Sequence, residues 1–401
     1  MVLILNSRLY RAVAILLLNA LVAFACFELA ALGFFEIKIP SVSSQSTEQL
    51  VGEGNPREEV SYYSSQDWAK RFWYEFRLTH TQRYSPYIVW RRPPFKGKTI
   101  EIDQNGVRVT PGADCSAKSF KVFTFGESAM WGTGSPNWGT IPANLQKGFE
   151  KLRQGPVCVM NFAETAWVST QDVIMLMLQL RSGNVPDLVL SYGLSGDLGA
   201  AYETGRAGVH ANLDQITARF HMRKESHSLV GWLRSTHAYS LMDHLVGKLT
   251  IANLQQKELT PTELITYESR GIDVAELSEL IVQDYFGNYK IVNALAQTYG
   301  FKYFFFLPPI IVVGNKPLTF EEQEMKRRME SAVAASKLTM AVYQKIERES
   351  SKYQNLYSMA HVFDAYDFLI WIDGGHVTPI GNQLIAQRML DIIQARSSDG
   401  K

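Results

Sequence analysis

The feature that most constrains the fold is an alternation of short apolar segments and long amphipathic segments that begins at Ser119. Short apolar runs between polar turns predict buried strands, and longer amphipathic runs predict helices. We expect strands at Lys121–Phe125, Val157–Asn161, Leu188–Ser191, Tyr303–Leu307 and Leu356–Met359. Because helical segments separate them, these strands are expected to run parallel. The sequence therefore predicts an α/β fold, a three-layer α/β/α sandwich with a mostly parallel five-stranded sheet.

The clearest predicted helix covers Glu321–Glu349, where charged residues surround one apolar stripe. The stripe consists of Met325, Met329, Val333, Met340 and Tyr343. A second long segment, residues 197–271, is far longer than an ordinary connection in an α/β unit, and such insertions often cover active sites. We expect a lid there, with an amphipathic helix over residues 229–249.

Charge and cysteine content exclude several classes of protein. The chain has 401 residues, with 40 Lys and Arg against 39 Asp and Glu, and a formal net charge of +1. This balance creates no field that would attract nucleic acid, so no nucleic-acid partner is predicted. Three cysteines without metal-site spacing predict neither a zinc site nor a disulfide scaffold, and no cofactor is implied. Cys115 and Cys158 form either a disulfide or two separate thiols.

The five histidines of the insertion also lack the spacing of a helical metal site. They are His210, His221, His227, His237 and His244. We interpret them as surface or packing residues.

Residues 12–35 are almost continuously apolar, and roughly 24 helical residues are long enough to cross a bilayer core of about 30 Å. Arg8 and Arg11 precede this run, whereas Glu36 and Lys38 follow it and cancel, so the N-terminus is expected in the cytoplasm. The main domain would then be extracytoplasmic, either periplasmic or extracellular, on a single-pass anchor.

Glu28 within the apolar run leaves two other interpretations open. One is a cleavable signal peptide with a site at residues 23–25, and the other is a weak lipoprotein motif ahead of Cys26. All three interpretations export the main domain.

The chain divides into five predicted regions. Residues 1–11 are a cytoplasmic N-terminus, and 12–35 are the transmembrane anchor. Residues 36–66, rich in Ser, Glu and Gly from Ser41 onward, are predicted to be a stalk. Residues 67–116 form a small extension, with aromatic residues at helical spacing and a hairpin turn at Asn105-Gly106. Residues 117–401 form the main domain.

Two motifs carry the chemistry. Ser128 follows the first predicted strand through Gly126, a place where its hydroxyl can be exposed at the carboxyl edge of the sheet. His376 lies in a loop before the last helix, and Asp373 precedes it by three residues. An imidazole there can accept the serine proton while the carboxylate accepts its Nδ1 proton. Together they form a nucleophile, base and orienting acid.

These motifs resemble those of the SGNH (GDSL-type) hydrolases over residues 119–395, as in a single-pass membrane-anchored bacterial-type member. Residues 125–132, 161–171, 186–198 and 373–386 are similar to four of the family's blocks. The resemblance implies a flavodoxin-like sheet, with Ser128 as nucleophile, His376 as base and Asp373 as acid. It further implies an oxyanion hole formed by Ser128, Ala163 and Gly196.

Three positions depart from the family pattern. Glu127 occupies the place of the usual aspartate, Ala163 that of an oxyanion-hole glycine, and Gly196 that of an asparagine. Losing one oxyanion donor typically costs a factor of roughly 10² to 10³ in rate. Activity is therefore expected to be weaker, or to depend on Ser195 or a backbone amide.

The sequence thus predicts a membrane-anchored, extracytoplasmic serine esterase that acts on an ester, such as an acylated glycan or lipid. A glycan O-acetyltransferase differs only in the group that accepts the acyl chain. The alternative of another class is a non-catalytic SGNH-like scaffold or polysaccharide-binding protein of a cell-surface glycan export system, with polysaccharide biosynthesis machinery as its partners.

Overall fold

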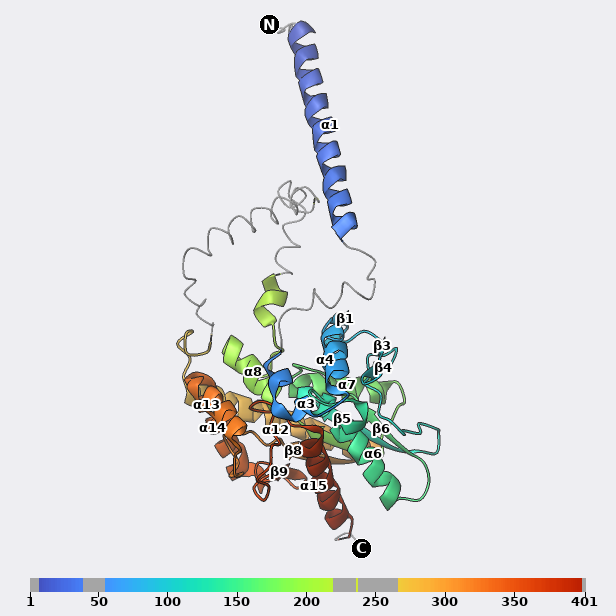
Figure 1. Cartoon of the computed structure of the whole chain (residues 1–401), viewed down its shortest axis with the longest axis vertical. Coiled ribbons are helices and arrows are strands. Elements are labelled where there is room, and N and C mark those ends of the chain that lie inside the picture. Colours follow the sequence, from blue (N-terminus) through green and yellow to red (C-terminus); the bar gives the residue numbers. More distant parts are fainter. Residues whose placement is uncertain (1–6, 39–54, 219–235, 237–265, 399–401) are drawn as a thin grey trace. The chain divides into compact units, whose positions relative to one another are not determined.

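The computed structural model describes residues 7–38, 55–218, 236 and 266–398. Its centre is a five-stranded sheet in the order β6-β5-β7-β8-β9, in which every neighbouring pair is parallel (Figure 1). The strands are β5 (Phe120–Gly126), β6 (Val157–Asn161), β7 (Leu188–Tyr192), β8 (Lys302–Leu307) and β9 (Leu356–Ser358). All five predicted strands are confirmed to within one residue at each end, and the sheet is wholly parallel.

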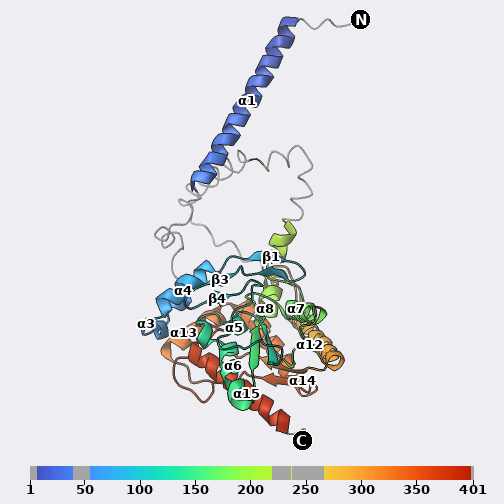
Figure 2. The same cartoon turned by 90° about the vertical axis from the view of Figure 1, so that its right-hand side faces the viewer.

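Helices cover both faces of the sheet, which confirms the predicted α/β/α sandwich (Figure 2). On one face α6 (Ile141–Leu152) packs against α15 (Pro379–Ser398). On the other, α12 (Val274–Tyr299) contacts α7 (Ser169–Arg181), α8 (Ser195–Thr204) and α14 (Val333–Ser350). Strand side chains alternate accordingly. Phe304 and Phe306 belong to the hydrophobic cluster that includes α6 and α15, whereas the ring of Phe305 contacts Tyr285 and Tyr289 of α12.

The predicted helix Glu321–Glu349 is instead two helices, α13 (Phe320–Ser331) and α14, separated at Ala332. The two apolar stripes face different neighbours. Met325 and Met329 of α13 pack against the cluster that contains the loop before α15, whereas the buried residues of α14 face α8 and α12. Val333, predicted within the stripe, is 53% exposed. One continuous helix could not direct both stripes inward, so the single-helix prediction was wrong.

The stalk prediction was wrong for its last part. Residues 55–66 fold as η1 (Pro56–Glu59) and α3 (Ser61–Ser64), while the earlier stalk residues 39–54 lie outside the described part of the chain. A polar segment was expected to bury too little apolar area to become ordered, but Val60 and Tyr63 are buried in the main core, and Tyr63 donates to Gly134 O.

The extension that follows packs on the main domain. The predicted aromatic stripe lies on α4 (Ala69–Leu78), where Phe72, Trp73 and Phe76 are buried. Two short hairpins come next: β1 (Arg83–Ser85) pairs with β2 (Val89–Arg91), and β3 (Phe95–Lys96) with β4 (Glu101–Ile102). Gly106 adopts φ 79° in the predicted turn, which closes with a single bridge between Ile102 and Arg108.

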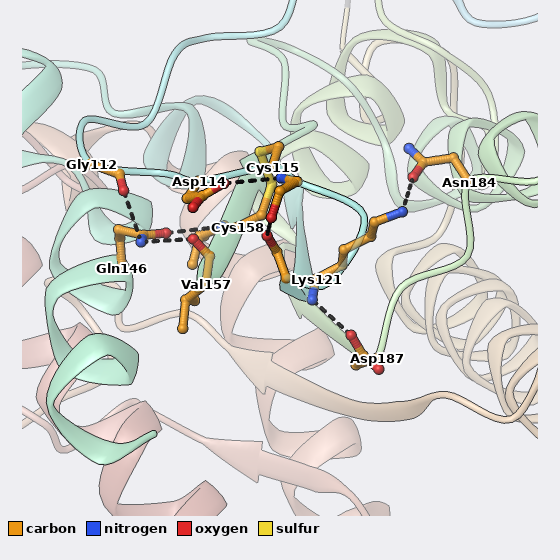
Figure 3. The surroundings of a disulfide bond; sticks show 12 residues. Gly112, Asp114, Cys115, Lys121, Gln146, Val157, Cys158, Asn184 and Asp187 are labelled. Carbon is orange, nitrogen blue, oxygen red and sulfur yellow. Dashed lines mark hydrogen bonds between the residues drawn. A yellow bond between two sulfur atoms is a disulfide. The ribbon is translucent and has the colours of Figure 1, made fainter. Parts of the chain in front are cut away.

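The structure decides between the two alternatives for Cys115 and Cys158. Cys115 and Cys158 form a disulfide that ties the loop before β5 to β6 (Figure 3). Near it, the side-chain amide of Gln146 donates to Val157 O, and the Lys121 amide donates to Asp187. The disulfide therefore reinforces the end of the sheet at which β5 and β6 begin.

The N-terminal helix α1 (Ser7–Lys38) is, among the described residues, the one helix long and apolar enough to cross a membrane. Its apolar window, Arg11–Leu29, has a mean hydropathy of 2.3. A membrane anchor and a signal sequence both have this character, so the topology remains a prediction.

The predicted lid falls largely on residues 219–235 and 237–265, which lie outside the described part of the chain. The first residues of the predicted insertion, from Asp197, belong to α8 and pack with the other helices of that face. The lid itself stays a prediction.

Candidate active site

Ser128 stands where the first strand of the sheet meets a short helix. Strand β5 ends at Gly126, and Ser128 begins α5 (Ser128–Trp131). Gly126 has φ 147°, and a Cβ there would lie 2.1 Å from the Tyr192 carbonyl oxygen, so only glycine fits this turn. The serine side chain is thereby placed half-buried at the carboxyl edge of the sheet.

The loop between β9 and α15 brings His376 to Ser128, across 248 residues of sequence. A bridge between Trp371 and Val377 closes this loop, and the Ile372 amide donates to His376 O. His376 Nε2 lies 2.7 Å from Ser128 Oγ, and the imidazole is 15% exposed. The two side chains share one hydrogen bond.

Asp373 lies on the opposite side of the imidazole, with Oδ2 2.8 Å and Oδ1 3.0 Å from His376 Nδ1. Oδ1 also accepts the backbone amides of Gly375 at 2.8 Å and His376 at 2.7 Å. Burial favours the neutral acid, but the charge and hydrogen bond of His376, the Arg57 charge and the Gly375 amide hold the Asp373 pKa well below its ordinary value. The carboxylate is therefore ionised.

The structure thus brings Ser128, His376 and Asp373 together in a continuous hydrogen-bonded chain. It also adds Arg57, whose Nε donates to Asp373 Oδ2. Sequence reasoning missed this residue because it lies 316 positions away in a segment interpreted as a stalk, and no local pattern connects the two.

The predicted oxyanion residues are not equally placed. The Ala163 amide donates to Asn161 Oδ1 at 3.2 Å, and Ala163 is fully buried. The Gly196 amide, with those of Leu194 and Ser195, donates to the Glu127 carboxyl group. The Ser128 amide begins a helix, where the first amides have no partner inside the helix. Of the three predicted donors, Ser128 is the one best placed.

Ala166 is a residue of this region that sequence reasoning did not single out. It lines the pocket that contains Ser128 and His376, and its φ is 60°, a conformation that favours glycine. An alanine gives no sequence signal for a left-handed backbone. Thr165 beside it accepts a hydrogen bond from the buried Arg92 guanidinium at 3.0 Å, which fixes this turn against the N-terminal extension.

Buried arginines of the extension also support the helix that begins at Ser128. Arg108 donates to the carbonyl oxygens of Trp131, Gly132 and Ser135, and its guanidinium lies 4.3 Å from the Trp131 ring centroid. The Arg92 guanidinium lies 3.9 Å from the same centroid. The extension thus holds the end of α5, the helix that Ser128 begins.

Near Ser128 lie three buried carboxyl groups, Glu127, Asp172 and Asp197. Burial and the Asp197 charge raise the pKa of Glu127 to about 8, although the amides of Gly196, Leu194 and Ser195 oppose this. Burial likewise raises the pKa of Asp197 to about 7 against its hydrogen bonds from Ser169, and raises that of Asp172 well above its ordinary value. Each of these carboxyl groups therefore holds its proton to a higher pH than an exposed carboxyl group does.

Two pockets open beside Ser128 and His376. The first, of about 280 Å³, is mainly apolar. Its apolar lining comprises Leu198, Tyr202, Ile310, Met329, Ala335 and Leu338. The second, of about 430 Å³, is more polar than the first, with Arg57, His80, Arg92, Thr133 and Thr165 among its residues. Both pockets are lined by Glu127, Ser128, Ser195, Gly199 and His376, so the hydroxyl of Ser128 lies where the two cavities meet.

Among the described residues no group of three His, Cys, Asp or Glu side chains could hold a metal ion. Of the histidines of the insertion, His210 lies in the described part, and its Nδ1 is 2.8 Å from Ala211 O. The other four lie outside it.

No protein-family model matches the chain, and no curated protein matches its sequence. Solved structures are similar to it. A lipase, Lip_vut3, from goat rumen metagenome is 13% identical over 68% of this chain and 96% of that chain, with a TM-score of 0.37. An acetyl xylan esterase, AlAXEase, is 12% identical over 68% and 99%, with a TM-score of 0.35. A member of the lipolytic protein G-D-S-L family from Veillonella parvula is 9% identical over 68% and 98%, with a TM-score of 0.34. These values are too low to assign a family, so the α/β/α fold rests on the sheet itself.

Proposed function

We propose that this protein is a serine esterase that transfers the acyl group of an ester to Ser128 and then to water. One observation carries the proposal: Ser128 Oγ lies 2.7 Å from His376 Nε2, while Asp373 accepts from the other nitrogen of the same ring at 2.8 Å. A serine, a base and an orienting acid in this order are the requirements of nucleophilic acyl transfer.

The reaction proceeds in two halves. Ser128 Oγ attacks the ester carbonyl carbon while its proton passes to His376 Nε2, and the imidazolium is stabilised by Asp373. The tetrahedral intermediate collapses when His376 returns the proton to the leaving alcohol, which leaves an acyl-serine. Water then attacks the acyl carbon, gives its proton to His376, and the acid departs as Ser128 recovers its proton.

The negative oxygen of the intermediate needs hydrogen-bond donors beside Ser128. The Ser128 amide is the first, and the Ala166 amide is a better second candidate than Ala163, because Ala166 lines the pocket while the Ala163 amide has an internal acceptor. Ser195 lines both pockets and is the candidate for a side-chain donor. Each donor is expected to contribute a factor of roughly 10² to 10³ to the rate.

The two pockets suggest how an ester would lie. The first, more apolar pocket suits the acyl chain, and the second, more polar pocket suits the alcohol part, such as a sugar or a lipid head group. A volume of 280 Å³ is about nine times the roughly 30 Å³ of one water molecule, enough for an acyl chain of several carbons. We therefore expect butyryl to octanoyl esters to be cleaved better than acetyl esters.

We infer an extracytoplasmic location on a single-pass anchor, with the N-terminus in the cytoplasm. The apolar helix α1 supports it, as does the Cys115–Cys158 disulfide, because disulfides persist in oxidising compartments and are rare in the cytosol. An acylated cell-surface glycan or a lipid is then the substrate class within reach.

The test uses the detergent-solubilised full chain and a fluorophosphonate probe, which reacts only with an activated serine. Wild type should be labelled, Ser128→Ala should not, and His376→Ala should be labelled at least about 100-fold more slowly. A folded wild-type protein that resists the probe would sink the esterase and favour the non-catalytic scaffold. Hydroxylated acceptors added during ester turnover distinguish a glycan O-acetyltransferase, which would form acylated acceptor in place of free acid.

A further inference from the structure

The two oxygens of the Asp373 carboxylate are held in different ways. Oδ1 accepts two amides of its own loop, from Gly375 and His376, and therefore moves with that loop. Oδ2 accepts from His376 Nδ1 and from Arg57 Nε. Among the described residues, Arg57 is thus the one hydrogen-bond donor to the carboxylate from outside the loop.

The segment that carries Arg57 is held by contacts within itself, with helix α4 and with the main domain. Asn55 Oδ1 accepts the Arg57 amide at 3.1 Å, and Glu58 forms an ion pair with Arg77 of α4. Val60 and Tyr63 are buried, and Tyr63 donates to Gly134 O at 2.8 Å. Arg57 therefore approaches Asp373 from a rigid segment and not as a free surface side chain.

We propose that Arg57 is a positioning residue of the active site, which acts on Ser128 through Asp373 and His376. The inference rests on the proposed function. By holding Oδ2, Arg57 fixes the rotation of the carboxylate, and the carboxylate in turn fixes the ring that reaches Ser128. The segment immediately before the extension, predicted from sequence to be a stalk, thus completes the catalytic arrangement.

The positive charge of Arg57 has a second effect, on pH dependence. The charged and titratable groups that face Asp373 in the described part of the chain are Arg57, Tyr63 and His376. His80 interacts electrostatically with Arg57. Burial raises the pKa of Tyr63 well above its ordinary value, so this phenol stays neutral. The chemistry needs an ionised Asp373 and a neutral imidazole, and a nearby cation favours both. Removing that cation should move the acid side of the activity profile to higher pH.

The experiment measures the rate constant of fluorophosphonate labelling between pH 5 and 9 in the solubilised full chain, with hydrolysis of p-nitrophenyl butyrate alongside. The variants are Arg57→Gln, which keeps size and loses charge, and Arg57→Lys, which keeps the charge. The matched control is Glu58→Gln, which breaks the neighbouring ion pair of the same segment without touching Asp373. Thermal unfolding checks that each variant is folded.

We expect Arg57→Gln to lower the labelling rate and kcat about tenfold at pH 7, with KM within about twofold. The acid side of its pH–rate profile should move to higher pH by roughly 0.5 to 1 unit. Arg57→Lys should restore the acid side of the profile and part of the rate, and Glu58→Gln should match wild type in both.

Four results would overturn the inference. Equal losses in Arg57→Gln and Glu58→Gln would mean that Arg57 only docks the segment. A rise in KM with kcat unchanged would mean that Arg57 contacts the substrate in the more polar pocket. Labelled wild type with an equally reactive Arg57→Gln would remove Arg57 from the mechanism while leaving the esterase intact, whereas unlabelled wild type would remove both.

Discussion

Replacing Glu127 by glutamine should change how the stability of this protein depends on pH. Glu127 is 3% exposed, directly precedes Ser128, and has a pKa raised to about 8 by burial and by Asp197. In the unfolded chain its pKa is the ordinary 4.5. Glutamine has nearly the same shape and does not ionise, so the variant removes the titration of this group.

The sign follows from the direction of the shift. Because the folded state holds the proton more tightly than the unfolded state, Glu127 costs no stability below pH 4.5. The cost grows as the pH rises from 4.5 to about 8 and is constant above that. Each unit of pKa difference corresponds to about 1.36 kcal/mol, which gives a cost of about 3 kcal/mol at pH 7 and approaches 5 kcal/mol above pH 8.

The free energy of unfolding should therefore be measured by urea denaturation at several pH values for wild type and Glu127→Gln. The difference between the two curves, variant minus wild type, should increase by roughly 3 kcal/mol between pH 5 and pH 8. A constant offset is also expected, because the amide loses part of the hydrogen bonding to Leu194, Ser195 and Gly196, but an offset does not change the slope. Glu330→Gln, an exposed carboxylate of α13, is the control and should leave the curves parallel. Parallel curves for Glu127→Gln as well would refute a raised pKa at this site.

Three further predictions concern the framework of the site. Gly196→Asn should not restore an oxyanion donor, because a Cβ there would lie 1.8 Å from the Trp167 carbonyl oxygen. We expect thermal unfolding to show a variant at least about 3 kcal/mol less stable than wild type. A well-folded variant that hydrolyses esters faster would contradict this. Arg108→Met should cost about 3 to 6 kcal/mol in urea unfolding, since three carbonyl oxygens lose their donor, and a loss below about 1 kcal/mol would show that water replaces the guanidinium. Replacing Cys115 and Cys158 together by serine should lower the free energy of unfolding by about 4 kcal/mol, because the disulfide closes a loop with a 43-residue separation. The comparison with wild type is made under non-reducing conditions, and unchanged stability would contradict the prediction.

Strands β5 to β8 could be predicted because each is a short apolar run buried on both faces, whereas in β9 only Leu356 is buried. Phe304, Phe305 and Phe306 point alternately to the two helical layers, and both layers are apolar, so the sequence carries one continuous signal with clear ends. The position of Ser128 at the edge of the sheet could be predicted for a related reason. A residue that follows a buried strand must lie at the sheet edge, whatever the rest of the chain does.

Contacts made across the fold left no such signal. Arg57 and Arg108 look like ordinary surface arginines in sequence, and their roles arise only when the extension packs over α5 and the loop of Asp373. The break at Ala332 was missed for the opposite reason. The 3.6-residue period continues across it, although the neighbours that receive the two stripes change.

The departures at Glu127 and Gly196 are best understood as one arrangement and not as two independent losses. The Glu127 carboxyl group, one methylene longer than an aspartate, accepts the amides that begin α8, including that of Gly196. A side chain at position 196 would meet Glu127 Cγ at 3.1 Å as well as the Trp167 carbonyl oxygen. Given this packing, an asparagine at position 196 is excluded by sterics, so its absence carries no evidence that the site has decayed. The proposed activity then depends on Ser128, His376 and Asp373, whose hydrogen bonds form without an asparagine at position 196.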